Sequence, residues 1–149
     1  MTTAEPTPIH SSRDASAVAP PRRSTLNIVL WIVQVLLALL FIWAGGMKLV
    51  LPLEKLAGPV ALPGALVRFI GVAELLGGLG LILPSLLRIR PGLTPLAAAG
   101  LVIIMIGAVV ITLAGGVDVG LAAIPGVTGL LAAFVAYGRW RLAPIRSKE

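Results

Sequence analysis

The chain of 149 residues contains no cysteine and a single histidine. The absence of cysteine excludes disulfides, thiol redox chemistry, and cysteine-ligated zinc or iron–sulfur clusters. The one histidine, His10, lies in a segment rich in Pro, Ser, Thr and Ala, away from every long apolar run. We therefore expect no metal site and no resident redox cofactor. The sequence offers no catalytic constellation, which argues against an enzymatic activity of this chain alone.

Charged residues are also scarce. They make up 12% of the chain, whereas 58% of the residues are hydrophobic and the mean hydropathy is +1.03. A soluble domain of this size does not need so much apolar surface, and long apolar runs indicate membrane spans. The isoelectric point near 11.2 would also suit a nucleic-acid-binding protein. However, the basic residues flank the apolar runs, so lipid headgroups and membrane topology explain them better, and no nucleic-acid partner is expected.

Four apolar segments are each long enough to cross a hydrocarbon core of about 30 Å at about 1.5 Å per residue. We expect these spans at about 26–50, 65–87, 94–114 and 119–140. The sequence therefore predicts an all-α, integral membrane four-helix bundle in one domain, residues 25–141. A disordered tail (1–24) and a short basic tail (142–149) flank it.

Two features near the spans refine this prediction. Arg22 and Arg23 precede the first span as in a secretory or twin-arginine signal, but the apolar region is longer than a signal's, which favours a retained signal-anchor. Residues 52–64 are too short and too broken to span, so we expect a short interfacial helix and turn there. Pro125 predicts a kink near the start of the fourth span.

The basic residues are divided unequally between the two sides of such a bundle. Three of them, Lys48, Lys55 and Arg68, fall on the side away from the termini. Nine fall on the side of the termini: Arg13, Arg22, Arg23, Arg88, Arg90, Arg139, Arg141, Arg146 and Lys148. The positive-inside rule then predicts a multi-pass protein of the cytoplasmic membrane with both termini inside.

Small residues recur along the spans at helical spacing. In the second span, Gly71, Gly77 and Gly78 share one face with Glu74. Glycines in the other spans extend the pattern: Gly45, Gly100, Gly107, Gly126 and Gly129. Helices in lipid associate by close packing, which favours small residues at the contact. We expect these glycines to pack helix against helix, with Glu74 turned towards the other helices.

Glu74 lies near the middle of the second span, where a carboxylate is costly. Arg68 is six residues earlier, about 240° around the helix, so the two cannot pair along one face. Lys48, near the end of the first span, is the natural partner. We expect Arg68 to extend towards the headgroups.

Two interpretations of Lys48 and Glu74 remain open. In the first, they form an ion pair that sets helix register. In the second, they lie in a shallow outward-facing pocket, with Thr112 nearby and Glu74 at its floor, which receives a quinone, a lipid or a segment of a partner protein. A proton or ion path is less well supported, because it would require a chain of titratable groups and Glu74 stands alone at its depth.

The segments FIWAGGMKL, RFIGVAELLGGLGLILP, LLRIRP and YGRWRLAP resemble the DoxX/DoxX-like family of small four-helix membrane proteins. The resemblance covers about residues 26–141, and its most specific elements are Gly45, Lys48, Gly71, Glu74 and Leu75. The family motif coincides with Lys48 and Glu74. It implies association with quinol or thiosulfate:quinone oxidoreductases, with oxidative-stress complexes, or with assembly of other membrane proteins. Most relatives have no assigned activity. The thiol-dependent relatives require cysteines that this chain lacks.

Three functions are therefore considered. The glycine faces, the small size and the lack of redox groups favour a non-catalytic subunit or assembly factor that contacts a membrane-protein partner through its helices. The alternative is a quinone- or lipid-binding component of a membrane oxidoreductase. The third is a small transporter or channel, which four spans would form only as a homo-oligomer.

Overall fold

The computed structural model describes residues 22–56, 58, 60–87, 89–90 and 92–144, and in these ranges it contains four long α-helices and no strand. The helices are α1 (Arg22–Val50), α2 (Gly64–Leu87), α3 (Leu93–Ala114) and α4 (Val119–Tyr137). A short 3₁₀ helix, η1 (Leu53–Leu56), follows α1, and a π-helical turn, η2 (Gly138–Leu142), continues α4. All four long helices are long and apolar enough to cross a membrane.

The helix bounds agree closely with the predicted spans, with one difference at the start of α1. This helix begins at Arg22, so residues 22–24 belong to it and not to the predicted tail. Residues 1–21 and 145–149, the remainder of the two predicted tails, lie outside the described residues. The short helix expected within residues 52–64 is η1. Helix α4 continues through Pro125, as α2 does through Pro84.

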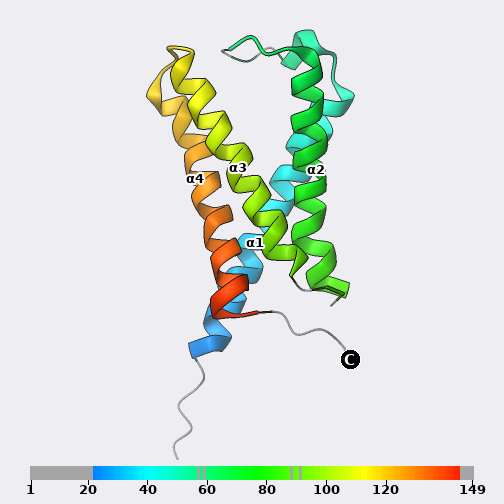
Figure 1. The fold of residues 1–149 in the computed structure, drawn as a ribbon, viewed down its shortest axis with the longest axis vertical. Coiled ribbons are helices and arrows are strands. Elements are labelled where there is room, and N and C mark those ends of the chain that lie inside the picture. Colours follow the sequence, from blue (N-terminus) through cyan, green and yellow to red (C-terminus); the bar gives the residue numbers. More distant parts are fainter. Residues whose placement is uncertain (1–21, 57, 59, 88, 91, 145–149) are drawn as a thin grey trace, which may run out of the picture.

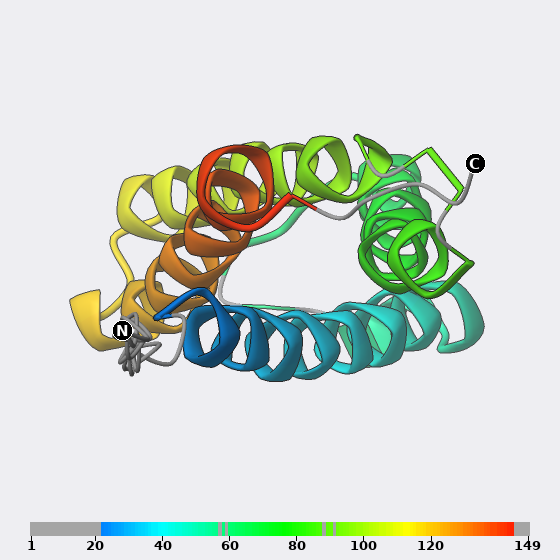
Figure 2. The same ribbon diagram turned by 90° about the horizontal axis from the view of Figure 1, so that it is seen from below.

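The helices follow one another around a ring in the order α1, α2, α3, α4 (Figure 2). Helix α1 packs mainly on α2, and α3 packs mainly on α4. The start of α1, the α2–α3 connection and η2 lie at one end, which we call the terminus end (Figure 1). The α1–α2 connection with η1 and the α3–α4 connection lie at the other, the loop end. The described parts of α1 and α4 thus leave the bundle on the same side.

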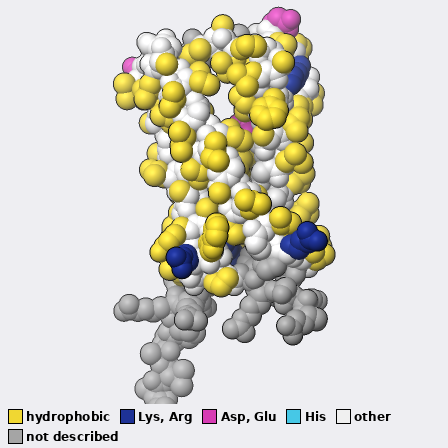
Figure 3. Space-filling view, in the orientation of Figure 1, with side chains coloured by type: hydrophobic (Ala, Val, Ile, Leu, Met, Phe, Trp, Pro, Cys, Tyr) yellow, Lys and Arg dark blue, Asp and Glu magenta, His cyan; other side chains and the backbone are white. Residues whose placement is uncertain are grey.

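The interior and the exterior of the bundle are both apolar, as expected in lipid. The buried core is formed by Leu37, Ala38, Phe41, Leu81, Ala98, Leu101, Met105, Ala132 and Val135. Large side chains also point outwards: Trp43, Phe69 and Ile103 are each more than 60% exposed. Hydrophobic side chains cover the length of the molecule, and charges gather towards its two ends (Figure 3). Hydrocarbon, which has no polar groups to satisfy, suits this outer surface.

Helices α1 and α2 approach closely where they cross at Gly45 and Gly71. A Cβ atom added at Gly45 would lie 2.6 Å from the carbonyl oxygen of Gly71 and 2.7 Å from the amide nitrogen of Leu75. Farther along α2, Gly78 faces α1, where an added Cβ would lie 2.9 Å from Ile42. Glycine is required here because neighbouring backbone occupies the space of a side chain.

Two further glycines lie at helix contacts. Gly77 faces Leu101 of α3, 2.6 Å from where its Cβ would be, and Gly129 of α4 faces Met105, at 3.0 Å. The expectation of close packing does not hold at Gly100 and Gly107, where an added Cβ would meet no atom of the described chain within 4 Å.

Gly126 also departs from the predicted pattern, because a Cβ added there would meet only Val109 among the described residues within 4 Å, at an ordinary 3.9 Å. Gly100 and Gly107 are open because of the face that α3 turns to the bundle. That face carries Ala98, Leu101 and Met105, which leaves Gly100 exposed and Gly107 at the edge of a cavity.

Candidate functional site

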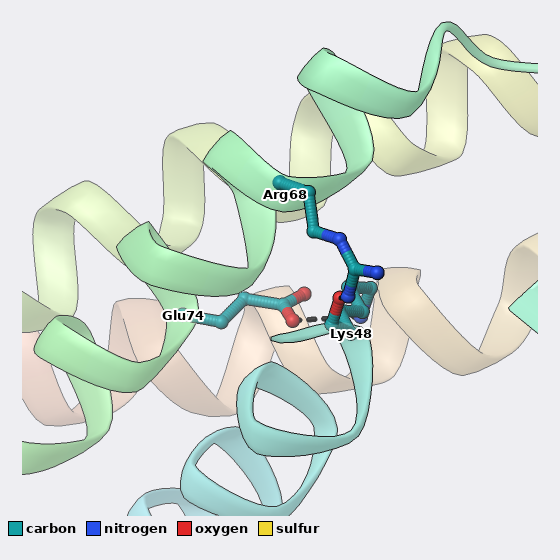
Figure 4. A network of polar contacts seen from close by, with 3 residues as sticks. All are labelled: Lys48, Arg68 and Glu74. Carbon is teal, nitrogen blue, oxygen red and sulfur yellow. Dashed lines mark hydrogen bonds and ion pairs between the residues drawn. The ribbon is translucent and has the colours of Figure 1, made fainter. Parts of the chain in front are cut away.

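Lys48 and Glu74 form an ion pair near the loop end of the bundle (Figure 4). The lysine Nζ lies 2.7 Å from Oε2 of Glu74, whose side chain is 5% exposed, compared with 30% for Lys48. The glycine crossing explains this geometry. Gly45 and Gly71 each lie three residues before a member of the pair, so the point of closest approach brings the two side chains into reach.

Arg68 stabilises the same junction from nearly two turns before Glu74 on α2 (Figure 4). Its Nη1 donates a hydrogen bond to the carbonyl of Lys48, and its Nη2 donates to the carbonyl of Leu51 at 2.9 Å. The last carbonyls of a helix lack partners within the helix, and the planar guanidinium can reach two of them at once. Arg68 therefore caps the end of α1 and does not extend to headgroups as expected. Its position also places a cation at the negative end of the α1 dipole.

A cavity of about 640 Å³ opens beside the ion pair. Its polar lining consists of Lys48, Glu74 and Thr112, while the rest of its wall comes mainly from apolar residues of α2, of α3 and of the described part of the α1–α2 connection. Figure 3 shows the molecular surface hollowed between α2 and α3 towards the loop end, with an acidic side chain inside the hollow. This volume lies within the range of pockets that bind small molecules. An apolar wall with a few polar groups is also typical of such pockets.

The pair offers hydrogen-bond donors to this cavity. An ammonium has three N–H donors, and Glu74 accepts one of those of Lys48, which leaves two for another acceptor. The hydroxyl of Thr112 donates to the carbonyl of Ala108 at 2.8 Å, so its oxygen remains available as an acceptor. Among the described residues, no three His, Cys, Asp or Glu side chains come together as a metal site would need. The arrangement is suited to holding a polar head in an apolar pocket.

Substitutions in the ion pair are expected to have unequal effects. Lys48→Met leaves a buried carboxylate without its partner, at a cost of about 3 kcal/mol in the free energy of unfolding. Glu74→Gln costs less, about 1 to 2 kcal/mol, because the partly exposed Lys48 can bend towards polar surroundings. The double variant strands no charge and is expected to be more stable than Lys48→Met alone. Unfolding in mild detergent measures all three, and strictly additive losses would argue against the pairing.

A second polar cluster, the terminus-end network, joins α1, α2, α3 and the turn η2 that continues α4, at the opposite end of the bundle. Gln34 of α1 donates to the carbonyl of Leu81 at 2.5 Å and to the hydroxyl of Ser85 at 2.8 Å, both on α2. Ser85 contacts the hydroxyl of Thr94, on α3, at 2.7 Å. From η2, Arg139 donates through Nε to Oε1 of Gln34 at 2.8 Å. Apart from its connection to Asn27, the network is buried.

The π-helical turn η2 directs Arg139 into this network. The amide of Ala143 donates to the carbonyl of Gly138 at 2.8 Å, which closes the wide turn. Gly138 packs on Leu30, 2.5 Å from where its own Cβ would be. Arg139 is consequently 3% exposed. It donates to Oδ1 of Asn27 at 2.7 Å and stacks over the ring of Trp31 at 5.2 Å, a cation–π contact.

Sequence reasoning did not identify this network. Arg139 was counted only as a topology-determining charge, and neutral polar residues such as Gln34, Ser85 and Thr94 are common in membrane helices. A signal was present, because Gln34 is an amide side chain deep inside the first span and requires a partner, whereas Asn27 lies at the start of that span. Nothing local indicates that this partner lies 105 residues later.

The sequence was compared with families and with individual proteins. A model of the DoxX-like family matches residues 32–135, more than half of the chain. The matched segment includes Lys48, Arg68 and Glu74 and ends before Arg139. No curated protein and no solved structure gave a match. Given this match and four helices able to cross a membrane, the chain is a multi-pass membrane protein and belongs to the DoxX-like family.

Proposed function

We propose that the protein is a non-catalytic membrane component whose loop-end cavity binds a lipophilic molecule with a hydrogen-bond-accepting head, such as a quinone. The single observation that carries this proposal is the apolar cavity of about 640 Å³ with the Lys48–Glu74 pair in its wall. An ion pair that served packing alone would not need a cavity beside it. Lys48 keeps free donors for a carbonyl head, and the apolar wall accepts the ring and part of a tail.

A binding experiment with one quinone probe tests this proposal. Decylubiquinone added to the purified protein in mild detergent is expected to raise the melting temperature by several degrees, because a ligand that binds only the folded state stabilises it. Gly107→Leu is expected to abolish the shift. Residue 107 lines the cavity, and a Cβ added there would meet no atom of the described residues within 4 Å, so a larger side chain can begin there without a clash and is expected to take up part of the cavity.

Gly100→Leu is the matched control. Gly100 also lies on α3 with open space around it, but it does not line the cavity. The Gly100→Leu variant should retain the full shift with decylubiquinone. The double variant Lys48→Met/Glu74→Gln should lose most of it without stranding a charge. The absence of a shift in the unmodified protein, or equal shifts in both leucine variants, would refute the proposal.

We also propose that the terminus end faces the cytoplasm of the cell membrane, so that the cavity faces outwards. The excess of basic residues on the side of the termini supports this orientation. Because the chain has no cysteine, single-cysteine variants report it cleanly. A membrane-impermeant maleimide is expected to label Lys55→Cys in intact cells and Arg141→Cys only after permeabilisation. The reverse pattern would invert the proposed orientation.

A further inference from the structure

A shallow groove of about 580 Å³ runs between α3 and α4 towards the terminus end, on the outside of the bundle. Its floor is made of small residues, Ala99 on α3 and Ala133 and Ala136 on α4. At the end nearest η2 it is bordered by Tyr137, Trp140 and Arg141. The groove is therefore apolar along most of its length and becomes aromatic and basic where the helices end.

The deepest point of the groove lies within one leaflet of a bilayer. On α3 it reaches Ile103, ten residues after the helix begins at Leu93, which is about 15 Å of helix. This is half of a hydrocarbon core of about 30 Å. Tyr and Trp side chains at the other end match the depth of the headgroups, where amphipathic rings are favoured.

The charge at this end of the molecule is not balanced by the described chain. The described carboxylates are Glu54, Glu74 and Asp118, which all belong to the loop-end half, and the one ion pair in the described ranges is Lys48–Glu74. At the terminus end, Nη2 of the buried Arg139 has no hydrogen-bond partner among the described residues. Arg141 follows on the same π turn and is exposed. An anion in the groove would complement Arg141, which lines it, whereas Arg139 is buried and does not line the groove.

We propose that this groove is a binding site for an anionic phospholipid. One acyl chain lies along the alanine floor, and the phosphate lies against Arg141 beside the ring of Trp140. The occupant is identified by the combination of features, since a soluble anion would not need the apolar groove and a neutral lipid would not need the arginine. The site is separate from the loop-end cavity, so it does not depend on the proposed function.

The test compares phospholipids of opposite headgroup character on the full chain in mild non-ionic detergent. Dioleoylphosphatidylglycerol should raise the melting temperature by several degrees more than dioleoylphosphatidylcholine, and native mass spectrometry should retain the anionic lipid on the protein. Arg141→Gln should weaken binding of the anionic lipid about fivefold, the loss expected for one basic side chain at a lipid surface. Because Arg141 is exposed, this variant should fold normally.

Arg90→Gln is the charge-matched control, since Arg90 is an exposed arginine in the α2–α3 connection and does not line the groove. It should bind the anionic lipid as the unmodified protein does. Equal losses in Arg90→Gln and Arg141→Gln would show diffuse surface charge and overturn the proposal. So would equal stabilisation by the two lipids, or full stabilisation by glycerol phosphate, which has the phosphate without the acyl chains.

Discussion

Replacing Gln34 by leucine is expected to lower the free energy of unfolding by about 3 kcal/mol, although the side chain keeps nearly the same size. The amide of Gln34 accepts from Arg139 and donates to Leu81 and Ser85. Leucine removes all three bonds at once. Nε of the buried Arg139 guanidinium then lacks a partner, as Nη2 already does among the described residues. An unpaired donor on a buried charged group costs more than an unpaired donor on a neutral group.

The double variant Gln34→Leu/Arg139→Leu separates this effect from the loss of packing. With the guanidinium gone, no buried charge is stranded, so the second change should recover part of the loss caused by the first. Thr128→Val is the control for removing a polar group from a membrane helix. In the part of the chain that the structure describes, Thr128 bonds only the carbonyl of Ile124 in its own helix, so the change should cost less than about 0.5 kcal/mol. Reversible unfolding in detergent measures each value, and a small effect of Gln34→Leu would contradict the role of the network.

Gly45→Ala is the second large effect that we expect, with a loss of about 3 kcal/mol, the upper end of the usual cost of overpacking. The added methyl group would lie 2.6 Å and 2.7 Å from backbone atoms of α2, at Gly71 and Leu75. Backbone cannot rotate away as a side-chain end can, so α1 and α2 would have to separate. Their separation would also weaken the Lys48–Glu74 pair, whose members lie one turn beyond the crossing.

Gly46→Ala provides a control at the neighbouring position. An added Cβ there meets no atom within 4 Å. Alanine has the higher helix propensity, so this change should be neutral or stabilising by up to about 1 kcal/mol. Thermal unfolding of both variants in the same detergent compares them directly. Equal melting temperatures would show that α1 and α2 do not depend on the close approach.

Much of the fold was predictable because lipid constrains a chain so strongly. A backbone in hydrocarbon must satisfy its own hydrogen bonds, so an apolar run of sufficient length becomes a helix. This is why α2, α3 and α4 each begin within a residue of their predicted starts. The start of α1 was placed too late because Arg22 and Arg23 are polar. A helix does not have to stop where hydrocarbon ends, so hydropathy does not mark its true start.

The site was predictable only where a residue was costly enough to stand out. Glu74 required an explanation in hydrocarbon, and Lys48 was the cation within reach, so sequence reasoning brought these two together. Arg68 was misjudged because its partners are backbone carbonyls, which carry no sequence signature. The glycines show a different limit. Spacing groups Gly100 and Gly107 on one face of α3, but it does not reveal whether a neighbouring helix covers that face.

The terminus-end network also implies an order of assembly. The bonds from Gln34 to Leu81 and Ser85 join residues 47 and 51 positions apart, whereas the bond to Arg139 spans 105. Contacts between near residues close before distant ones, so the α1–α2 and α3–α4 hairpins form first and Arg139 joins them last. Until then the side-chain oxygen of Gln34 on the α1–α2 hairpin and the guanidinium of Arg139, which follows the α3–α4 hairpin, lack each other as partners. Two copies that exchanged their α3–α4 hairpins would form the same bonds, which makes this bundle a candidate for domain swapping at high density in the membrane.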